Sequence, residues 1–469
     1  MSIPKSLPFL LLSSSIIMLL TSCNSVFIED SYAASFGGEV INPTSPYILF
    51  YKGTEVIDTI PLKEDNTFFK KFDSLAPGLY SFKHEPEYQY VFFDKNDSLM
   101  VRINSKDFDE SIVFCGKGDE KNNFLMELYL KNESDKEKMF DVFDYGVSKF
   151  NAHIDSAYKS NQKFYNSKKE ELKWSDEFDV YAKTALDFHY FSKKELYPIF
   201  HQLRTGEDIR AKLPKDFYAF RKKINFNNVA LSGYSPFVMY LSHMLNNVGS
   251  INYHNHYSEV DLSLKTNINK LNITDTLIKN EKVKNTILNN IAFTYLLEDQ
   301  NMVNNKKFLD TYHKYSTDKS KKNEILKIGN AIQLLKAGNT LPNVNLIDTN
   351  GKIVQSNSLI KNKTVLFFWT ENASSHLVAA HKKVMAFKLK YPEYQFIAIN
   401  LDENQSKWTN LLSKYNFDGI DEFRCENFQD LRNKWAITKV HRTIVLNNDA
   451  TIKNAFVNLF EVTFEDNLK

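Results

Sequence analysis

An apolar run near the C-terminus, followed at once by a polar turn, constrains the fold of this chain most strongly. Residues 365–369 read Val-Leu-Phe-Phe-Trp, a composition typical of a strand that is covered on both faces. A short turn follows through Ala373, and Ser374 or Ser375 is suited to N-cap the next helix. The stretch therefore predicts a strand, a turn and a helix start at the centre of a C-terminal domain.

The rest of the C-terminal region alternates strand and helix patterns around that unit. After a loop and a hairpin opening, the expected elements are a strand at Thr364–Trp369, a helix at about Ser375–Lys390, a strand at Gln395–Leu401, a helix at about Gln405–Tyr415, a helical turn near Phe428–Trp435, and an antiparallel pair at Thr443–Leu446 and Thr451–Phe456. Alternating strands and helices with a terminal hairpin predict an α/β domain over residues 338–469.

Two regions of different pattern precede this domain, so the expected fold class is multidomain. Residues 37–116 contain short strand-like runs between turn signals, which predicts an antiparallel β-sandwich. Residues 117–337 carry apolar residues at helical spacing without a fixed repeat, which predicts a central all-α domain. Pro198 is expected to interrupt a helix there. We interpret as core, rather than as a binding face, an aromatic group in this region: Tyr181, Phe188, Tyr190 and Phe191.

The first 22 residues read as a signal peptide rather than as part of the fold. A short basic start is followed by an apolar, Ser-rich segment that ends in Leu-Thr-Ser-Cys23. This tetrapeptide resembles a bacterial lipobox, which implies lipidation of Cys23 and a membrane anchor that does not span the bilayer. An ordinary secretory signal that happens to contain a cysteine is the alternative. Residues 23–36 would then form a tether, and the expected location is the cell envelope, with the outer membrane favoured.

Composition excludes some functional classes. The 469-residue chain has a formal net charge of +2, which gives no electrostatic argument for a nucleic-acid partner. Beyond Cys23 only Cys115 and Cys425 remain, and we expect both to be buried as small hydrophobic residues rather than paired in a disulfide. Because no Cys or His cluster has the spacing of a structural zinc site, no cofactor is expected.

The β-rich region resembles a known group of domains. These N-terminal β-domains, of unassigned function, precede thioredoxin-like domains in lipoproteins of Bacteroidota. The matching stretches are Val56–Leu62, Pro77–Phe82, Asp97–Leu99 and Phe114–Phe124. The resemblance implies an architecture and a compartment but no reaction.

Residues 339–469 resemble the thioredoxin-like redoxins of the bacterial envelope, which are related to cytochrome-maturation thiol reductases. The resemblance rests on Leu341-Pro342, Gly351-Lys-Ile353, Phe368-Trp369 and the stretch Trp435–Leu446. It implies a thioredoxin fold and a Cys-x-x-Cys motif at the helix start. In this chain the two cysteine positions fall on Ala373 and His376, the cis-proline position on His441, and the glycine of the last hairpin on Ala450.

These replacements remove the parts of a dithiol site. Dithiol exchange needs a thiolate and a second thiol that resolves the mixed disulfide, and neither alanine nor histidine supplies one. We therefore expect a redox-inactive domain in a protein that is not an enzyme. The expected function is that of a binding or accessory subunit of an outer-membrane or periplasmic complex, with a protein partner in the envelope.

Two alternatives remain open at this point. One is an enzyme related to thiol–disulfide oxidoreductases that uses unrecognised residues. The other is a metal-binding domain in which His376, His441 and Glu371 meet, because two imidazoles and a carboxylate suit zinc or copper. A serine nucleophile at Ser374 or Ser375 is disfavoured, since N-capping explains both serines.

Overall fold

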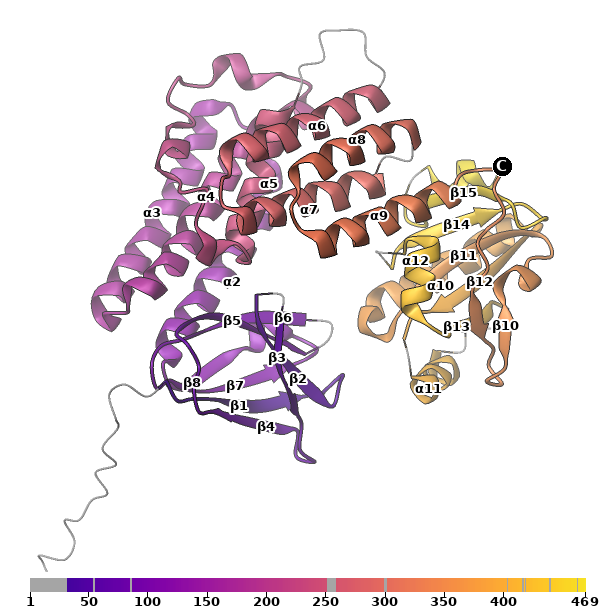
Figure 1. Cartoon of the computed structure of the whole chain (residues 1–469), viewed down its shortest axis with the longest axis horizontal. Coiled ribbons are helices and arrows are strands. Elements are labelled where there is room, and N and C mark those ends of the chain that lie inside the picture. Colours follow the sequence, from indigo (N-terminus) through magenta and orange to yellow (C-terminus); the bar gives the residue numbers. More distant parts are fainter. Residues whose placement is uncertain are drawn as a thin grey trace, which may run out of the picture. The chain divides into compact units, whose positions relative to one another are not determined.

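In the computed structural model the chain forms two compact units, residues 1–127 with 172–178, and residues 128–171 with 179–469. Figure 1 shows the helices and strands of the chain. The structure describes residues 32–53, 55–84, 87–250, 259–298, 302–402, 404–415, 417, 419–437, 440–461 and 463–469. The predicted signal peptide and Cys23 lie outside the described residues. No helix in these described ranges is long and apolar enough to cross a membrane.

The first unit contains a β-sandwich, which confirms the predicted fold class. Its strands are β1 (Ala34–Ile41), β2 (Tyr47–Lys52), β3 (Glu55–Pro61), β4 (Thr67–Phe72), β5 (Gly78–His84), β6 (Glu87–Phe93), β7 (Ser98–Asn104) and β8 (Val113–Lys117), with the short helix α1 (Phe108–Ser111) between the last two. They form two sheets in the orders β4-β1-β7-β8 and β3-β2-β5-β6.

The burial of every second residue along the strands explains how the two sheets pack into a sandwich. In β7 every second residue is buried, and the inward side chains of both sheets meet in an aromatic core. Phe50, for example, stacks on Tyr80 with ring centroids 5.2 Å apart. Two details differ from the sequence analysis: β1 begins at Ala34, inside the stretch expected as a tether, and β1 pairs with β7 in parallel.

The central region is helical, as predicted. Its helices are α2 (Asp119–Val142), α3 (Val147–Leu172), α4 (Asp176–Thr205), α5 (Ser235–Gly249), α6 (Glu259–Leu277), α7 (Glu281–Glu298), α8 (Met302–Tyr315) and α9 (Lys319–Leu334), with the 3-10 turns η2 (Ile209–Lys212), η3 (Ala219–Lys223) and η4 (Val229–Leu231). Pro198 lies inside α4, so the expected interruption is wrong. The buried apolar side chains of α4 stabilise the helix by packing. This stabilisation can outweigh the one backbone hydrogen bond that proline cannot donate.

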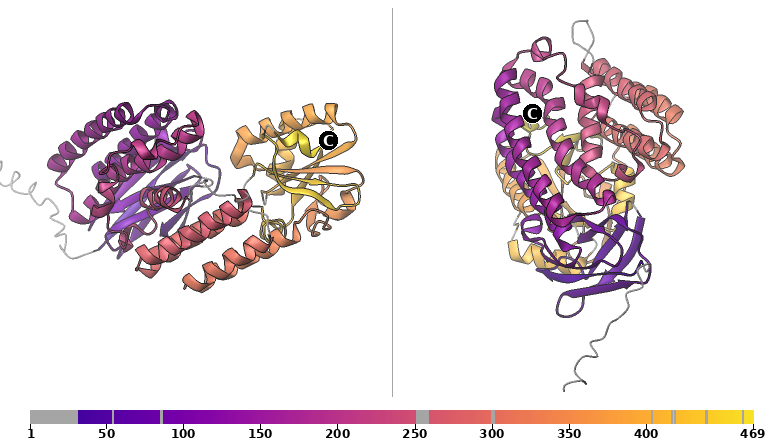
Figure 2. Two further views of the ribbon diagram at one scale, coloured as in Figure 1. Left: turned by 90° about the horizontal axis from the view of Figure 1, so that it is seen from above. Right: turned by 90° about the vertical axis from the view of Figure 1, so that its left-hand side faces the viewer.

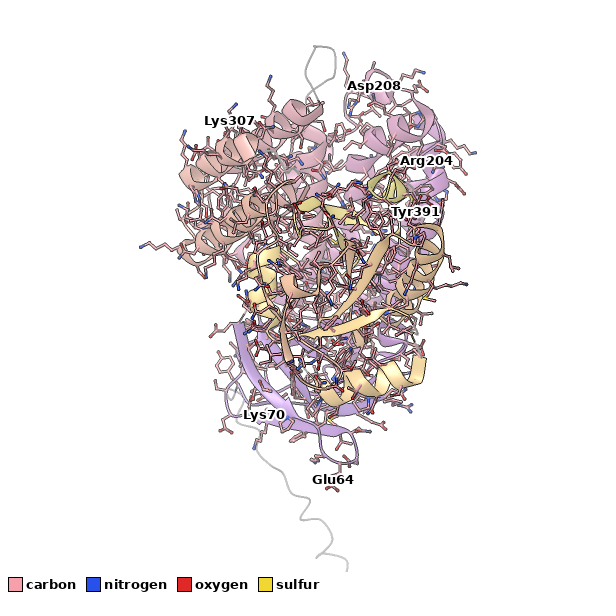
Figure 3. All side chains as sticks on the ribbon, turned by 90° about the vertical axis from the view of Figure 1, so that its right-hand side faces the viewer. Glu64, Lys70, Arg204, Asp208, Lys307 and Tyr391 are labelled. Atoms are coloured by element: carbon pink, nitrogen blue, oxygen red, sulfur yellow. The ribbon has the colours of Figure 1, made fainter. Side chains whose placement is uncertain are left out.

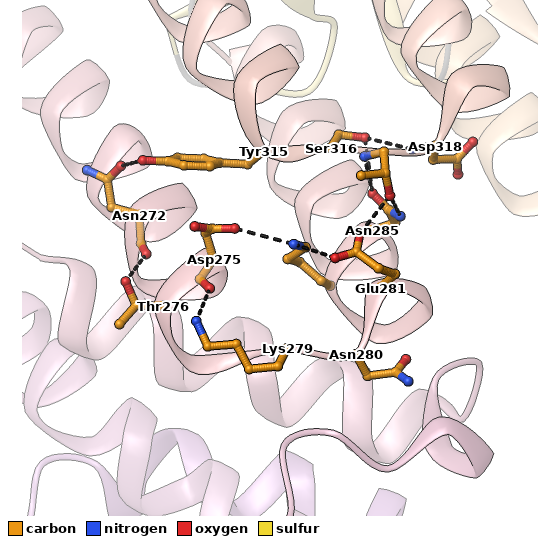
Figure 4. Close-up of polar contacts among 12 residues, drawn as sticks. Asn272, Asp275, Thr276, Lys279, Asn280, Glu281, Asn285, Tyr315, Ser316 and Asp318 are labelled. Atoms are coloured by element: carbon orange, nitrogen blue, oxygen red, sulfur yellow. Dashed lines mark hydrogen bonds and ion pairs between the residues drawn. The ribbon is translucent and has the colours of Figure 1, made fainter.

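Helices α6 to α9 pack side by side (Figures 1 and 2). Polar side chains tie their ends together (Figure 4): Thr317 Oγ1 donates to Glu281 over 2.7 Å, and Tyr315 Oη donates to Asn272 over 2.8 Å. Charged side chains such as those of Asp208 and Lys307 are exposed on the outside (Figure 3). These contacts orient the helix ends but leave the stability to apolar burial between the helices.

The C-terminal region is an α/β domain built on one mixed sheet. Its elements are β9 (Asn345–Ile347), β10 (Ile353–Gln355), η5 (Ser356–Leu359), β11 (Lys363–Trp369), η6 (Glu371–Ala373), α10 (Ser374–Lys390), β12 (Tyr394–Asn400), α11 (Gln405–Tyr415), β13 (Asp421–Cys425), α12 (Phe428–Trp435), β14 (Arg442–Leu446), β15 (Ile452–Asn458) and η7 (Phe464–Asn467). The strand order is β10-β9-β13-β12-β11-β14-β15.

Strand β11 is an inner strand of this sheet, next to the central strand β12, and lies between parallel β12 and antiparallel β14. Helix α10 covers one face, where Phe367 and Trp369 pack with Leu377. On the other face Phe368 meets Trp435 of α12, with ring centroids 6.2 Å apart. The predicted strand, turn and helix are thus confirmed, and the burial of β11 on both faces explains its unbroken apolar sequence.

Candidate site at the β11–α10 junction

The turn between β11 and α10 is braced by a carboxylate from the neighbouring strand. Asp402 follows the end of β12, and the carboxyl ends of parallel strands meet at one edge of a sheet. Its side chain accepts hydrogen bonds from the Thr370 hydroxyl and from the Glu371 backbone N–H, the latter over 2.8 Å. Asn400 Nδ2 donates to the same carboxylate over 2.8 Å. Charge-assisted bonds of this kind hold the turn in one conformation.

Helix α10 begins at Ser374 with Ala373 as its N-cap residue, and no side-chain hydrogen bond caps it. The expectation that Ser374 or Ser375 is the N-cap is therefore wrong by one residue. The chain enters the helix directly from the short turn η6, which ends at Ala373. A methyl group thus stands at the place where the family resemblance puts the first cysteine.

His376, in the first turn of α10, packs back against the strand. Its Nε2 lies 3.1 Å from the carbonyl oxygen of Phe368, and its ring centroid lies 5.5 Å from that of Phe460. Burial lowers the pKa of His376, although a hydrogen bond to the Phe368 carbonyl opposes the shift. The backbone of Val440 contacts the same imidazole, so the loop before β14 does reach this position.

That loop continues into a buried arginine. Arg442 Nε donates to the carbonyl of Ala455 over 2.9 Å, its Nη1 donates to the carbonyl of Ala436, and its guanidinium lies 4.0 Å from the ring centroid of Phe456. Its Nη2 is buried and has no hydrogen-bond partner among the residues that the structure describes. Burial lowers the pKa of Arg442 to about 9. Sequence reasoning missed this residue, because arginine is rarely buried without a carboxylate.

The three residues considered for a metal site are not assembled as one. The carboxylate of Glu371 lies 3.9 Å from Lys407 of α11, while His376 is engaged with the strand β11 backbone. His441, the residue before β14, is half-buried. Over the described ranges, the structure contains no group of three or more His, Cys, Asp or Glu side chains that could hold a metal ion. The chemistry offered here is hydrogen bonding and packing.

A second imidazole lies deeper and was missed by the sequence analysis. His381 of α10 is 2 % exposed, its Nδ1 lies 2.6 Å from the carbonyl of Leu377, and its Nε2 lies 2.9 Å from Glu422 Oε1. Trp369 Nε1 donates to the other carboxylate oxygen over 3.1 Å. A carbonyl only accepts, so Nδ1 donates to Leu377, while Nε2 faces the carboxylate. The imidazole and the carboxylate therefore form a buried polar pair beneath the end of β11.

This buried polar pair reaches the surface through its carboxylate. Glu422 lines a shallow hollow of about 400 Å³ together with Phe417, whose ring stacks on His381 at a centroid distance of 3.6 Å. His381 and Glu422 are 41 residues apart in sequence, so only the packing of α10 against β13 brings them together.

The outer face of α10 carries an exposed apolar row. Val378, Met385 and Leu389 are 44 %, 40 % and 85 % exposed, and their spacing of seven and four residues places them on one side of the helix. The helix also carries four lysines and no carboxylate. Helical spacing in the sequence already groups these three residues on one side of the helix, but it does not show whether that side is buried or exposed.

The two cysteines of the described chain differ in exposure. Cys425 of β13 is 1 % exposed, as expected, but Cys115 of β8 is exposed, and the expectation that it is buried is wrong. In β8 only Phe114 faces the core, so its neighbour Cys115 points to the opposite side of the sheet. Neither cysteine forms a disulfide within the described ranges.

A family model described as thioredoxin-like matches residues 362–452, from the residue before β11 to the first residue of β15. No curated protein matches the chain. The match covers two of the stretches on which the resemblance in sequence was based, Phe368-Trp369 and Trp435–Leu446, whereas Leu341-Pro342 and Gly351–Ile353 lie outside it. The resemblance of the β-rich region and the lipoprotein signal stay predictions.

Solved structures resemble part of this chain. The thioredoxin domain of a thiol-disulfide oxidoreductase from Bacteroides vulgatus is 17% identical, covers 29% of this chain and 93% of its own, and has a TM-score of 0.24. A domain of a possible thiol-disulfide isomerase from Cytophaga hutchinsonii is 19% identical, covers 28% and 90%, and has a TM-score of 0.25. A thiol:disulfide interchange protein from a Bacteroides species is 18% identical, covers 25% and 79%, and has a TM-score of 0.22.

The prediction that the chain is not an enzyme is corrected by these comparisons, because the neighbours are described as thiol–disulfide oxidoreductases and related proteins. The prediction of a thioredoxin-like fold is confirmed. The C-terminal region of this chain carries a thioredoxin-like domain.

Proposed function

We propose that the chain is an envelope lipoprotein, anchored through Cys23 in the outer membrane, whose thioredoxin-like domain binds a protein partner. The observation that carries the proposal is the exposed apolar row on α10, formed by Val378, Met385 and Leu389. Contiguous exposed apolar side chains in a polar surrounding are typical of interaction surfaces. The protein would thus act as a binding or accessory subunit of a membrane-associated complex.

The charge of α10 identifies the kind of partner. Lysines alternate with the apolar row, and the helix lacks aspartate and glutamate. A second copy of this helix would bring like charges together, which is destabilising. An amphipathic helix with an apolar stripe and acidic flanks would complement both features, as in helix-in-groove recognition. We therefore commit to a protein partner that presents such a helix.

The proposal includes a junction that does not exchange dithiols. Ala373 and His376 stand at the two places where the resemblance puts cysteines, and His376 is engaged with the Phe368 carbonyl. A histidine held in this way stabilises the entry into α10 and leaves the outer face of the helix for binding.

Two glutamate substitutions test this surface. Met385→Glu and Leu389→Glu place negative charge in the apolar row, so a partner with acidic flanks is expected to be lost when each variant is purified from detergent-solubilised membranes. Leu334→Glu is the matched control, because Leu334 is also exposed, at 54 %, but lies on α9. Retention of the same co-purifying protein by both α10 variants would refute the proposal. Flotation of the unaltered domain with anionic vesicles, abolished by the same variants, would assign the surface to lipid instead.

A second candidate is thiol–disulfide chemistry that does not use a Cys-x-x-Cys motif. The exposed free thiol of Cys115 favours it, because accessible thiolates are the reactive ones. Insulin reduction by the unaltered protein, lost in Cys115→Ser and kept in Cys425→Ser, would establish this activity. Turnover that survives both substitutions would require other residues, and absence of turnover would remove the candidate.

A further inference from the structure

A cavity of about 500 Å³ opens in the helical region, between α3, α4 and the chain segment that contains η3 and η4. This volume is in the range of small-molecule sites. Three of the residues that line the cavity, Phe188, Tyr190 and Phe191, belong to the aromatic group that the sequence analysis interpreted as core. Phe188 is buried, but Tyr190 and Phe191 are only half-buried, so that interpretation holds in part.

The walls of the cavity are aromatic. Phe191 stacks on Phe220 with ring centroids 4.4 Å apart and an interplanar angle of 10°. Tyr158 stacks on Tyr190 with centroids 4.4 Å apart and an angle of 26°. Rings held in parallel pairs present flat faces and edges, and a planar apolar body packs well against such surfaces.

The acceptors that line the cavity are already satisfied. Asp187 accepts a hydrogen bond from the Tyr158 hydroxyl over 2.7 Å and pairs with Lys183 over 3.0 Å. Asp179 pairs with Lys169 over 2.7 Å and also accepts from the Tyr165 hydroxyl. These carboxylates therefore do not require a cationic ligand.

The donors on the cavity wall, by contrast, are not used by other side chains of the described residues. Lys223 lines the cavity, is exposed, and forms an ion pair with no carboxylate of the described chain. Asn225 and Asn228 use their Oδ1 atoms to accept from the backbone N–H groups of Asn227 and Ala230. The Nδ2 groups of these two lining residues have no partner in the portion that the structure describes.

We infer that this cavity is a binding site for a small aromatic carboxylate, or another planar apolar molecule with one anionic head. The ring body would lie against the walls formed by Phe191, Phe220 and Tyr158, and the carboxylate would accept from Lys223, Asn225 and Asn228. Satisfied acceptors and unused donors on one rim select an anion over a cation of the same shape. This site lies outside the thioredoxin-like domain and does not depend on the function proposed for α10.

Calorimetric titration of the full chain with indole-3-acetate tests the proposal, with tryptamine as the cation of the same ring body. Indole-3-acetate is expected to bind saturably at millimolar or lower concentration, and tryptamine to bind more weakly. Lys223→Ala is expected to lower the affinity for indole-3-acetate about three- to fivefold, which is the effect of losing one exposed charge contact. Lys223→Glu is expected to reverse the preference toward tryptamine.

Lys222→Ala is the matched control, because Lys222 is the exposed neighbour of Lys223 in η3 and does not line the cavity. It should leave both affinities within twofold of the unaltered protein. Equal binding of the two probes, equal weakening by the two alanine variants, or no saturable binding of indole-3-acetate would each overturn the site. Unchanged melting temperatures of all variants confirm that the differences arise from binding.

Discussion

Single residues in this chain adopt conformations that their types do not prefer. Ala450, in the turn between β14 and β15, has a φ of +61°, the left-handed region that favours glycine. The family resemblance implies a glycine there, and Ala450 adopts the backbone conformation that suits glycine. Alanine in this region costs about 1–2 kcal/mol of conformational energy.

Ala450→Gly is therefore expected to raise the free energy of unfolding by about 0.5–1 kcal/mol, since part of the relief is offset by the flexibility of glycine in the unfolded chain. The measurement is the midpoint of urea denaturation. Ala455→Gly is the control, because Ala455 lies within β15 and is buried, so glycine should destabilise the protein there. A lower midpoint for Ala450→Gly than for the unaltered protein would contradict the argument.

Because the pKa of His376 is lowered, we expect the stability of the folded protein to depend on pH. Burial disfavours the imidazolium in the folded protein, so the unfolded chain binds a proton at higher pH than the folded chain does. Stability from this group is complete above the ordinary value of about 6.5 and is lost as the pH falls from there through the lower folded pKa. An NMR titration of the His376 ring should give a midpoint below 6.5.

His376→Asn should flatten the fall of the unfolding free energy in the same pH window. Part of the slope should remain, because burial also lowers the pKa of His313. A His376 midpoint at or above the ordinary histidine value would show that the imidazole is not held as described.

At the scale of elements, one buried carboxylate joins three segments of the helical region. Glu195 of α4 is 0 % exposed and accepts from Arg221 Nε of η3 over 2.8 Å and from Asn247 Nδ2 of α5 over 2.7 Å. Tyr240 of α5 donates to the same carboxylate over 3.4 Å. A buried charge with all partners in place fixes how these segments pack, although it contributes little net stability.

Arg221→Ala is expected to lower the free energy of unfolding by about 3–5 kcal/mol, because it leaves the Glu195 charge buried without its cation. Chemical denaturation measures the loss. Arg204→Ala is the control. Arg204, at the end of α4 (Figure 3), pairs with the exposed carboxylate of Asp144, so this substitution should lower the free energy of unfolding far less. Equal losses for the two variants would mean that burial does not decide the strength of these pairs.

At the scale of the whole molecule, the predicted lipid anchor decides where the two compact units work. Cys23 is the residue on which that anchor depends. Acyl chains on one residue bind a protein to a membrane with no spanning helix, and two or more chains are needed for stable anchoring. The β-sandwich, the helical region and the thioredoxin-like domain would then all lie on one side of the bilayer.

Cys23→Ser is expected to move the protein from the detergent phase to the aqueous phase in Triton X-114 partitioning of cells that express it. Cys115→Ser is the control and should stay in the detergent phase, since Cys115 belongs to the folded β-sandwich. Aqueous partitioning of the unaltered protein would contradict lipidation.

The sequence by itself determined the elements whose signals are local. The apolar run of β11 and the helix α11 were predicted within one residue of their observed bounds, because burial on both faces and helical periodicity are written in neighbouring residues. The short strand β13 was missed. Its mixed sequence Asp-Glu-Phe-Arg-Cys becomes a strand only because β12 and β9 pair with it.

Only the tertiary structure decided which side chains meet. The contact between His381 and Glu422 and the exposure of Cys115 depend on which face of a helix or strand turns inward, and a lone residue type does not show that. The cavity beside Phe220 and Lys223 likewise forms where segments distant in sequence fail to fill the space between them. Local sequence determines how often buried residues recur along a helix or strand. Packing between distant segments determines which face of that element turns inward, and the candidate sites of this protein depend on this second property.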